Sequence, residues 1–293
     1  MKRTLPTGLA ILLSGTFCAM SCKKSLEPAP ADARASLHDT TMTAVNTTVN
    51  PYPVTPTQEC IYLPDYGDSI VYPQPAAGNF YIYPKNTQGV QGTYLSWPQG
   101  LIINPTTGTI NVTQSQTGQR YDVAFVQYGT TDTCVSQLIV AGTAYMDSIY
   151  VLPQGNPIAA PYFNANPGIP SPCKSGKNAC SFDYFDYATR QGVAIDKHTG
   201  VIDLRNTASK IFGKNPFNGA TLNTTIFYML NDNSNRAPQQ IPLQMIYYNR
   251  RSDIPPALIA TITARRNSTF NNQLLTKAPA PTRPPIVIIV RAL

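Results

Sequence analysis

The sequence predicts an all-β protein with two tandem modules, and two observations lead to this prediction. From Cys60 onward, short segments rich in Tyr, Ile, Val and Phe alternate with clusters of Gly, Pro, Asn and Thr, as strands alternate with turns. The stretch "GLIINPTTGTINV" at 100–112 also returns as "GVAIDKHTGVIDL" at 192–204, with each position 92 residues further on. We therefore expect one β-sandwich at 58–146, a second at 147–250, and a C-terminal extension at 251–293.

The repeated stretch has the composition of a turn between two strands. Asn or Asp at its start can accept hydrogen bonds from the backbone two residues on, and the later Gly can take a positive φ. The flanking isoleucines then face the core. His198 occupies the slot that Thr106 fills in the first copy, which favours a turn position over a catalytic one. The turn residues of the two copies are Gly100, Asn104, Gly108, Gly192, Asp196 and Gly200.

Residues 1–21 have the pattern of a lipoprotein signal peptide. A basic start precedes a mostly apolar run of 13 residues, and Ser21-Cys22 resembles the lipobox of bacterial lipoproteins. The resemblance implies cleavage before Cys22, a lipid on Cys22, and attachment to the outer membrane or cell surface. The alternative is a secreted protein in which Cys22 is incidental. Residues 22–57 are rich in Ala, Pro, Thr and Asn and predict a flexible linker.

Charge and cysteine content narrow the classes of partner. The formal net charge is +7, but the basic residues are scattered and form no stripe with aromatics, so no nucleic acid is expected. No tight Cys-x-x-Cys pair is present, and neither a metal nor a cofactor is expected. An even number of remaining cysteines in an exported chain predicts two disulfides. Of the three possible pairings, we favour Cys173–Cys180 and Cys60–Cys134.

The stretch "WPQGLIINPTTGTINV", followed by "GQRYDVAFV", resembles the immunoglobulin-like and cadherin-like repeats of Bacteroidota-type envelope lipoproteins. The second copy shares the turn but lacks the Pro before Gly192. The resemblance covers about 190 residues. It implies an immunoglobulin-like two-sheet sandwich for each module. It implies no activity, because such modules host many functions.

The sequence holds no pattern typical of a catalytic centre, so we expect no enzymatic activity and no catalytic residue. The nearest candidate is "FDYFDY" at 182–187, which we expect to be a strand with core aromatics and with Asp183 and Asp186 facing water. The alternative is part of an acidic sugar or calcium site. Exposed aromatics are the usual platform for glycans. The candidate ligand surface is therefore Trp97, Tyr184 and Tyr187, with a packing role as the alternative for Trp97.

The C-terminal stretch offers two further β-type segments. "SDIPPALIATITARRN" can start a strand, and "IVIIV" at 286–290 is a strand that completes a sheet or, alternatively, is donated to a neighbouring subunit. We expect a membrane-anchored, non-enzymatic binding or structural/adhesion module. The alternatives are a glycan-binding accessory protein of a polysaccharide-uptake system, and a fimbrial or adhesin subunit. The expected partner is a polysaccharide or another envelope protein, and no oligomeric state is predicted.

Overall fold

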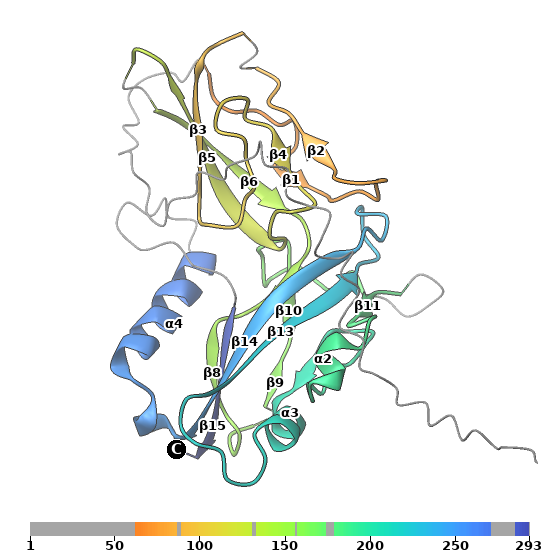
Figure 1. Ribbon diagram of the computed structural model, residues 1–293, viewed down its shortest axis with the longest axis vertical. Helices are drawn as coiled ribbons and strands as arrows, with labels where there is room; N and C mark the ends of the chain where they lie inside the picture. Colours follow the sequence, from red (N-terminus) through yellow and green to blue (C-terminus); the bar gives the residue numbers. More distant parts are fainter. Residues whose placement is uncertain are drawn as a thin grey trace, which may run out of the picture. The chain divides into compact units, whose positions relative to one another are not determined.

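The computed structural model describes residues 62–86, 89–130, 133–155, 157–173, 179–270 and 285–292 (Figure 1). The predicted signal peptide, Cys22, the linker and Cys60 lie outside the described residues. Among the helices in these ranges, none combines the length and the apolar composition that a membrane crossing requires.

We call the described residues up to Gly142 the first module. It is built on a four-stranded sheet with the strand order β1-β6-β5-β3. Strand β1 runs parallel to β6, with Ile70 opposite Ile139, and the other neighbours are antiparallel. A second, two-stranded sheet pairs β2 with β4. The strands are β1 (Ile70–Val71), β2 (Tyr81–Ile82), β3 (Gly92–Trp97), β4 (Ile110–Asn111), β5 (Gln119–Gln127) and β6 (Thr133–Val140).

We call the described residues from Thr143 onward the second module, which includes the C-terminal stretch after residue 250. It contains a five-stranded sheet with the order β11-β13-β14-β15-β8, and the small pairs β7–β10 and β9–β12. The all-β fold class predicted from the sequence is therefore confirmed by the strand pairing. The strands are β7 (Thr143–Tyr145), β8 (Ser148–Val151), β9 (Ile158–Ala159), β10 (Pro161–Phe163), β11 (Ser181–Phe182), β12 (Ile202–Asp203), β13 (Ala220–Met229), β14 (Gln239–Arg250) and β15 (Ile286–Ala292).

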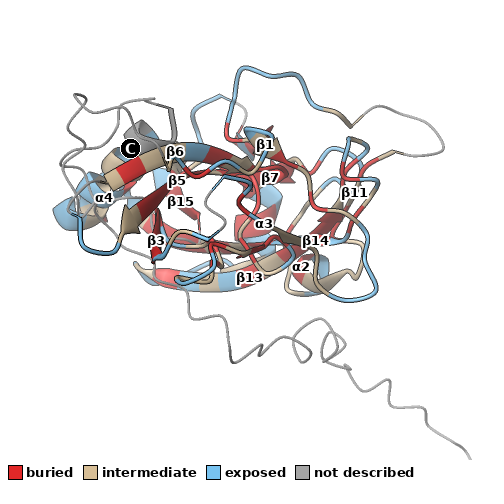
Figure 2. Ribbon diagram, turned by 90° about the horizontal axis from the view of Figure 1, so that it is seen from above, coloured by how far each residue is buried: buried red, intermediate tan, exposed pale blue. Residues whose placement is uncertain are grey.

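Helices cover parts of the second module, and the prediction of a strand at "SDIPPALIATITARRN" was wrong. That stretch forms the 3-10 turn Arg251–Asp253 and then α4 (Pro256–Phe270). Proline fits the first position of a helix because its missing N–H has no intrahelical partner there. Leu258, Ile259 and Ile262 have helical spacing and pack on the sheet. Buried residues follow the strands, whereas the outward side of α4 is exposed (Figure 2). The other α-helices within the described residues are α2 (Tyr187–Arg190) and α3 (Leu204–Ile211).

Strand β15 completes the five-stranded sheet, as the sequence predicted for "IVIIV". It lies between β14 and β8 and runs parallel to both, with Ile288 opposite Ile246 on one side and Ile149 on the other. Its two faces join different apolar clusters. Val287 and Ile289 pack into the main core of the module, while the alternate residues pack into the cluster that α4 covers. Burial on both faces explains why this segment reads as a continuous apolar run.

Both copies of the repeated stretch form the same turn. Asn104 Oδ1 accepts hydrogen bonds from the N–H groups of residues 106 and 107 at 2.9 and 3.0 Å, and Asp196 Oδ1 accepts from those of residues 198 and 199 at 2.9 and 2.8 Å. Gly108 and Gly200 have φ of 71° and 73°. In each copy a tyrosine hydroxyl donates to the carbonyl of that glycine, from Tyr66 at 2.7 Å and from Tyr145 at 2.5 Å. The two modules therefore share one local framework.

Candidate functional site

The stretch "FDYFDY" leaves the sheet after β11 and turns sharply into α2. Asp183 and Asp186 have positive φ values of 49° and 58°, although neither is a glycine. Such a conformation is unfavourable for most residues and is held in place by the surroundings. The prediction of one continuous strand here was therefore wrong beyond Phe182, because the chain needs two left-handed residues to reverse into the helix.

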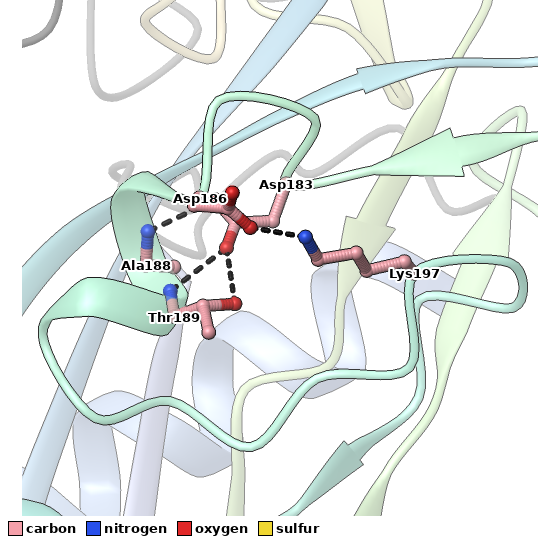
Figure 3. Close-up of polar contacts among 5 residues, drawn as sticks. All are labelled: Asp183, Asp186, Ala188, Thr189 and Lys197. Carbon is pink, nitrogen blue, oxygen red and sulfur yellow. Dashed lines mark hydrogen bonds and ion pairs between the residues drawn. The ribbon is translucent and has the colours of Figure 1, made fainter.

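Asp183 is fully buried and holds this turn through its carboxylate (Figure 3). Its Oδ1 accepts from Ala188 N at 2.9 Å, and its Oδ2 accepts from Thr189 N at 2.7 Å and Thr189 Oγ1 at 2.6 Å. The expectation that Asp183 faces water was wrong. The first N–H groups of a helix lack intrahelical acceptors, and this carboxylate supplies them from inside the fold.

The capped turn places three half-buried aromatic rings around Phe227 of β13. The ring centroids of Phe185 and Tyr187 lie 5.2 and 5.9 Å from that of Phe227, and Tyr184 lies 4.3 Å from Phe185. Burial raises the pKa of the Tyr184 phenol above its ordinary value. We call Tyr184, Phe185 and Tyr187, seated on Phe227, the aromatic surface.

An exposed ion pair lies beside the aromatic surface, between Asp186 of the turn and Lys197 of the repeated stretch (Figure 3). Nearly half of each side chain is solvent-accessible, with exposed fractions of 49% for Asp186 and 47% for Lys197. The hydrogen bond from Lys197 lowers the pKa of the Asp186 carboxyl. Partly exposed rings, two of them with polar tips, lie next to a carboxylate and an ammonium group, and such a set can stack on an apolar face and hydrogen-bond hydroxyl groups.

Trp97 does not belong to this surface, which corrects the sequence-based grouping with Tyr184 and Tyr187. It lies on β3 of the first module, is 3% exposed, and packs with Leu95 and Ala124. The indole also hydrogen-bonds the side chain of Asp122, whose carboxyl pKa is nevertheless raised by burial. A buried tryptophan cannot offer a stacking face to a ligand, and the packing alternative describes its place.

Three of the four cysteines that were predicted to form disulfides lie within the described residues. Cys173 and Cys180 form the disulfide that the sequence predicted, with a Cα–Cα distance of 5.0 Å, and so close the loop before β11. Cys134 is buried on β6, and its predicted partner Cys60 lies outside the described residues, so that pairing stays a prediction. Within the described ranges, no three His, Cys, Asp or Glu side chains gather as metal ligands would.

Sequence reasoning left Phe185 out of the candidate ligand surface, and it missed Phe227 and the cap made by Asp183. The position of Phe227 could have been found from strand alternation, because Ile226 and Tyr228 on either side face the main core. Phe227 must then point to the opposite face of the sheet. The cap by Asp183 had no comparable signal, since a short polar side chain before a helix also fits an exposed turn.

Comparison with known proteins does not assign this chain to a family. No family model and no curated protein matches the sequence. Among solved structures, a human protocadherin-24 fragment, EC1-2, is similar over 60% of this chain and 91% of its own length, at 9% identity and a TM-score of 0.21. A Drosophila N-cadherin fragment, EC1-4, is similar over 61% of this chain and 47% of its own length, at 11% identity and a TM-score of 0.20. These scores are too low to carry an argument about function.

Proposed function

We propose that this chain is a lipid-anchored, non-enzymatic binding module of the bacterial envelope, and that its ligand contacts the aromatic surface. The observation that carries the proposal is the buried carboxylate of Asp183, which fixes the turn that bears Tyr184, Phe185 and Tyr187. The turn is thereby held in one conformation although two of its residues, both aspartates, have positive φ, so the rings are in place before any ligand binds.

The chemistry of the aromatic surface favours a glycan over other ligands. Three rings in fixed positions lose little conformational entropy on binding, and each presents an apolar body and, in the tyrosines, a polar tip. The Asp186–Lys197 pair supplies an acceptor and donors at the edge of the rings. Sugar rings have apolar faces and hydroxyl edges, and this arrangement complements both.

The ligand is tested by native affinity electrophoresis of residues 23–293 through gels that contain a panel of polysaccharides. We expect retardation on at least one polymer, and loss of that retardation in Tyr184→Ala/Tyr187→Ala. Tyr128→Ala is the matched control, because Tyr128 is 59% exposed in the first module. If no polymer retards the chain, or if Tyr128→Ala abolishes binding equally, the aromatic surface is not a glycan site.

The proposed anchor rests on the sequence at Cys22, and it has a separate test. Cells given a labelled fatty acid should transfer label to the wild-type chain and not to Cys22→Ser. The wild-type chain should also fractionate with the outer membrane, while Cys22→Ser moves to the soluble fraction. Unlabelled wild-type protein would reject the anchor and leave the binding test unaffected, since that test uses the chain without lipid.

A second candidate function, an assembly subunit, is favoured by the place of β15. In the first module β1 pairs directly with β6, but in the second module β15 lies between β8 and β14. Without β15, two parallel strands would border an apolar slot that can accept the same strand from another copy. Donation of this kind joins subunits through backbone hydrogen bonds and buried alternate side chains.

Strand donation is tested by cysteine pairing between two differently tagged copies. Arg250 and Ala292 are exposed and lie opposite each other in the register of β14 and β15. Arg250→Cys on one copy and Ala292→Cys on the other, refolded together, should give a disulfide-linked heterodimer. Thr221→Cys, exposed on β13, replaces Arg250→Cys in the control and should give none. A heterodimer no more abundant than in the control would exclude donation.

A further inference from the structure

The loop between α3 and β13 carries a large apolar side chain that is exposed to solvent. Phe217 is 74% exposed, more than any other large apolar side chain in the part of the chain that the structure describes. The loop is nevertheless braced by the sheet. Asn249 N donates to Asn218 Oδ1 at 2.7 Å, and Gly219 N donates to Tyr247 O at 2.8 Å. Phe217 therefore projects from a fixed backbone without contributing its ring to a core.

Basic side chains gather at the same end of the sheet. The guanidinium of Arg291, on β15, donates to the carbonyl of Lys214 in this loop at 3.3 Å. Arg250 ends β14 opposite Ala292, and Arg251 follows it. Figure 1 shows the loop between α3 and β13 at the same end as the last residues of β15. We call Lys214, Phe217, Arg250, Arg251 and Arg291 the cationic end.

In the described part of the chain, the carboxylate of Asp253 lies beside these cations, and the four basic groups outnumber it. Asp253 Oδ2 accepts a hydrogen bond from Arg250 N at 3.0 Å. Lys214, Arg250, Arg251 and Arg291 are all exposed, so their charges remain available to a partner.

We propose that the cationic end is a contact surface for an anionic lipid membrane. Basic side chains are attracted to anionic headgroups, while an aromatic ring is stable at the boundary between headgroups and acyl chains. A soluble anion could bind the basic side chains, but it would offer no apolar environment for the ring of Phe217, which projects from a braced loop. The proposal does not depend on the glycan surface, which is formed by different residues.

The proposal is tested with a chain that starts at residue 25 and so lacks the signal segment, Cys22 and the Lys23–Lys24 pair. It is sedimented with vesicles of phosphatidylcholine alone or of phosphatidylcholine mixed with phosphatidylglycerol. We expect binding to the mixed vesicles only, weakened by added salt. Each cation removed should lower the partition constant about fivefold, so Lys214→Glu/Arg251→Glu should lower it at least about 25-fold.

The contribution of the ring is measured with Phe217→Ser, which should lower vesicle binding about tenfold or more. The matched controls are Tyr128→Ser and Lys85→Glu, both exposed in the first module, and neither should change binding. In Phe217→Trp, emission should shift to the blue on mixed vesicles, against the constant background of buried Trp97.

Any one of four results would overturn the proposal. The first is an absence of binding to the mixed vesicles. The second is an equal loss in the controls. The third is full competition by inorganic phosphate at an ionic strength where sodium chloride does not compete, because the cationic end would then be a phosphate site. The fourth is binding that survives Phe217→Ser unchanged, because the ring would then take no part in membrane contact.

Discussion

Gly200 shows how one residue of the repeated turn supports a module. Its φ is 73°, and a Cβ built on it would lie 2.6 Å from the ring of Phe182, which is fully buried. We expect Gly200→Ala to lower the free energy of unfolding by about 2–4 kcal/mol, from backbone strain together with overpacking. Chemical denaturation measures the change.

Gly213 is the matched control for this substitution, since its φ is 71° and no atom would lie within 4 Å of an added Cβ. Gly213→Ala should lower the free energy of unfolding by about 1–2 kcal/mol, from strain alone. Equal losses for Gly200→Ala and Gly213→Ala would show that contact with Phe182 is unimportant.

His198→Thr should leave the free energy of unfolding nearly unchanged, because the His198 side chain is exposed and only its backbone N–H donates to Asp196 in the turn.

Asp196 makes the stabilising contribution of the same turn depend on pH. Hydrogen bonds from the backbone of Thr199 and then of His198 lower the pKa of the Asp196 carboxyl. A group with a depressed folded-state pKa stabilises the fold above its unfolded pKa of about 3.9, and that contribution is lost as the pH falls through the folded value. Asp196→Asn copies Asn104 of the first module. We therefore expect wild type to lose stability relative to Asp196→Asn below about pH 4, with denaturation midpoints at neutral and acid pH as the measurement. A difference between the two proteins that does not change with pH would contradict this.

At the scale of the element, α2 depends on an acceptor that lies outside it. With only four residues, α2 has little intrinsic stability, and Asp183 satisfies its first N–H groups. Asp183→Ala leaves two N–H groups and the Thr189 hydroxyl without this partner, so we expect a loss of about 3 kcal/mol in the free energy of unfolding. Thr189→Ala removes one bond and should lose about 1 kcal/mol. Thermal or chemical denaturation measures the loss for each variant. Equal losses for Asp183→Ala and Thr189→Ala would mean that the hydrogen bonds from the N–H groups of α2 to Asp183 contribute little to stability.

Strands and helices differed in how far the sequence could predict them. Alternation marks β5 and β13, and the 92-residue repeat marks both turns, because these patterns are local. Helix α4 was missed because its Ile and Thr residues favour strands, and its helical face becomes evident only against the cluster that it covers. The aromatic surface was predicted in part. Tyr184 and Tyr187 lie there, but their support by Phe227 depends on a sheet pairing that the sequence alone does not specify.

At the scale of the whole molecule, the apolar cores of the two modules contain different residues. The first core holds Leu101, Tyr121 and Phe125, whereas the core around Ile226 includes residues of β15. The stability of the second module is therefore tied to the C-terminal strand, and the first module has no buried residue from it.

Removal of β15 should consequently unfold one module and spare the other. A chain that ends at residue 284 loses five buried side chains, Ile286 to Val290, each worth about 1.5–3 kcal/mol, which together match the stability of a typical domain. Amide hydrogen exchange should then show lost protection in β13 and β14, while β5 and β6 keep theirs. A chain that ends at Val290 retains all five side chains and should exchange like wild type. Loss of protection in both modules would mean that they unfold as one cooperative unit, since the core of the first module contains no β15 residue and would still have unfolded.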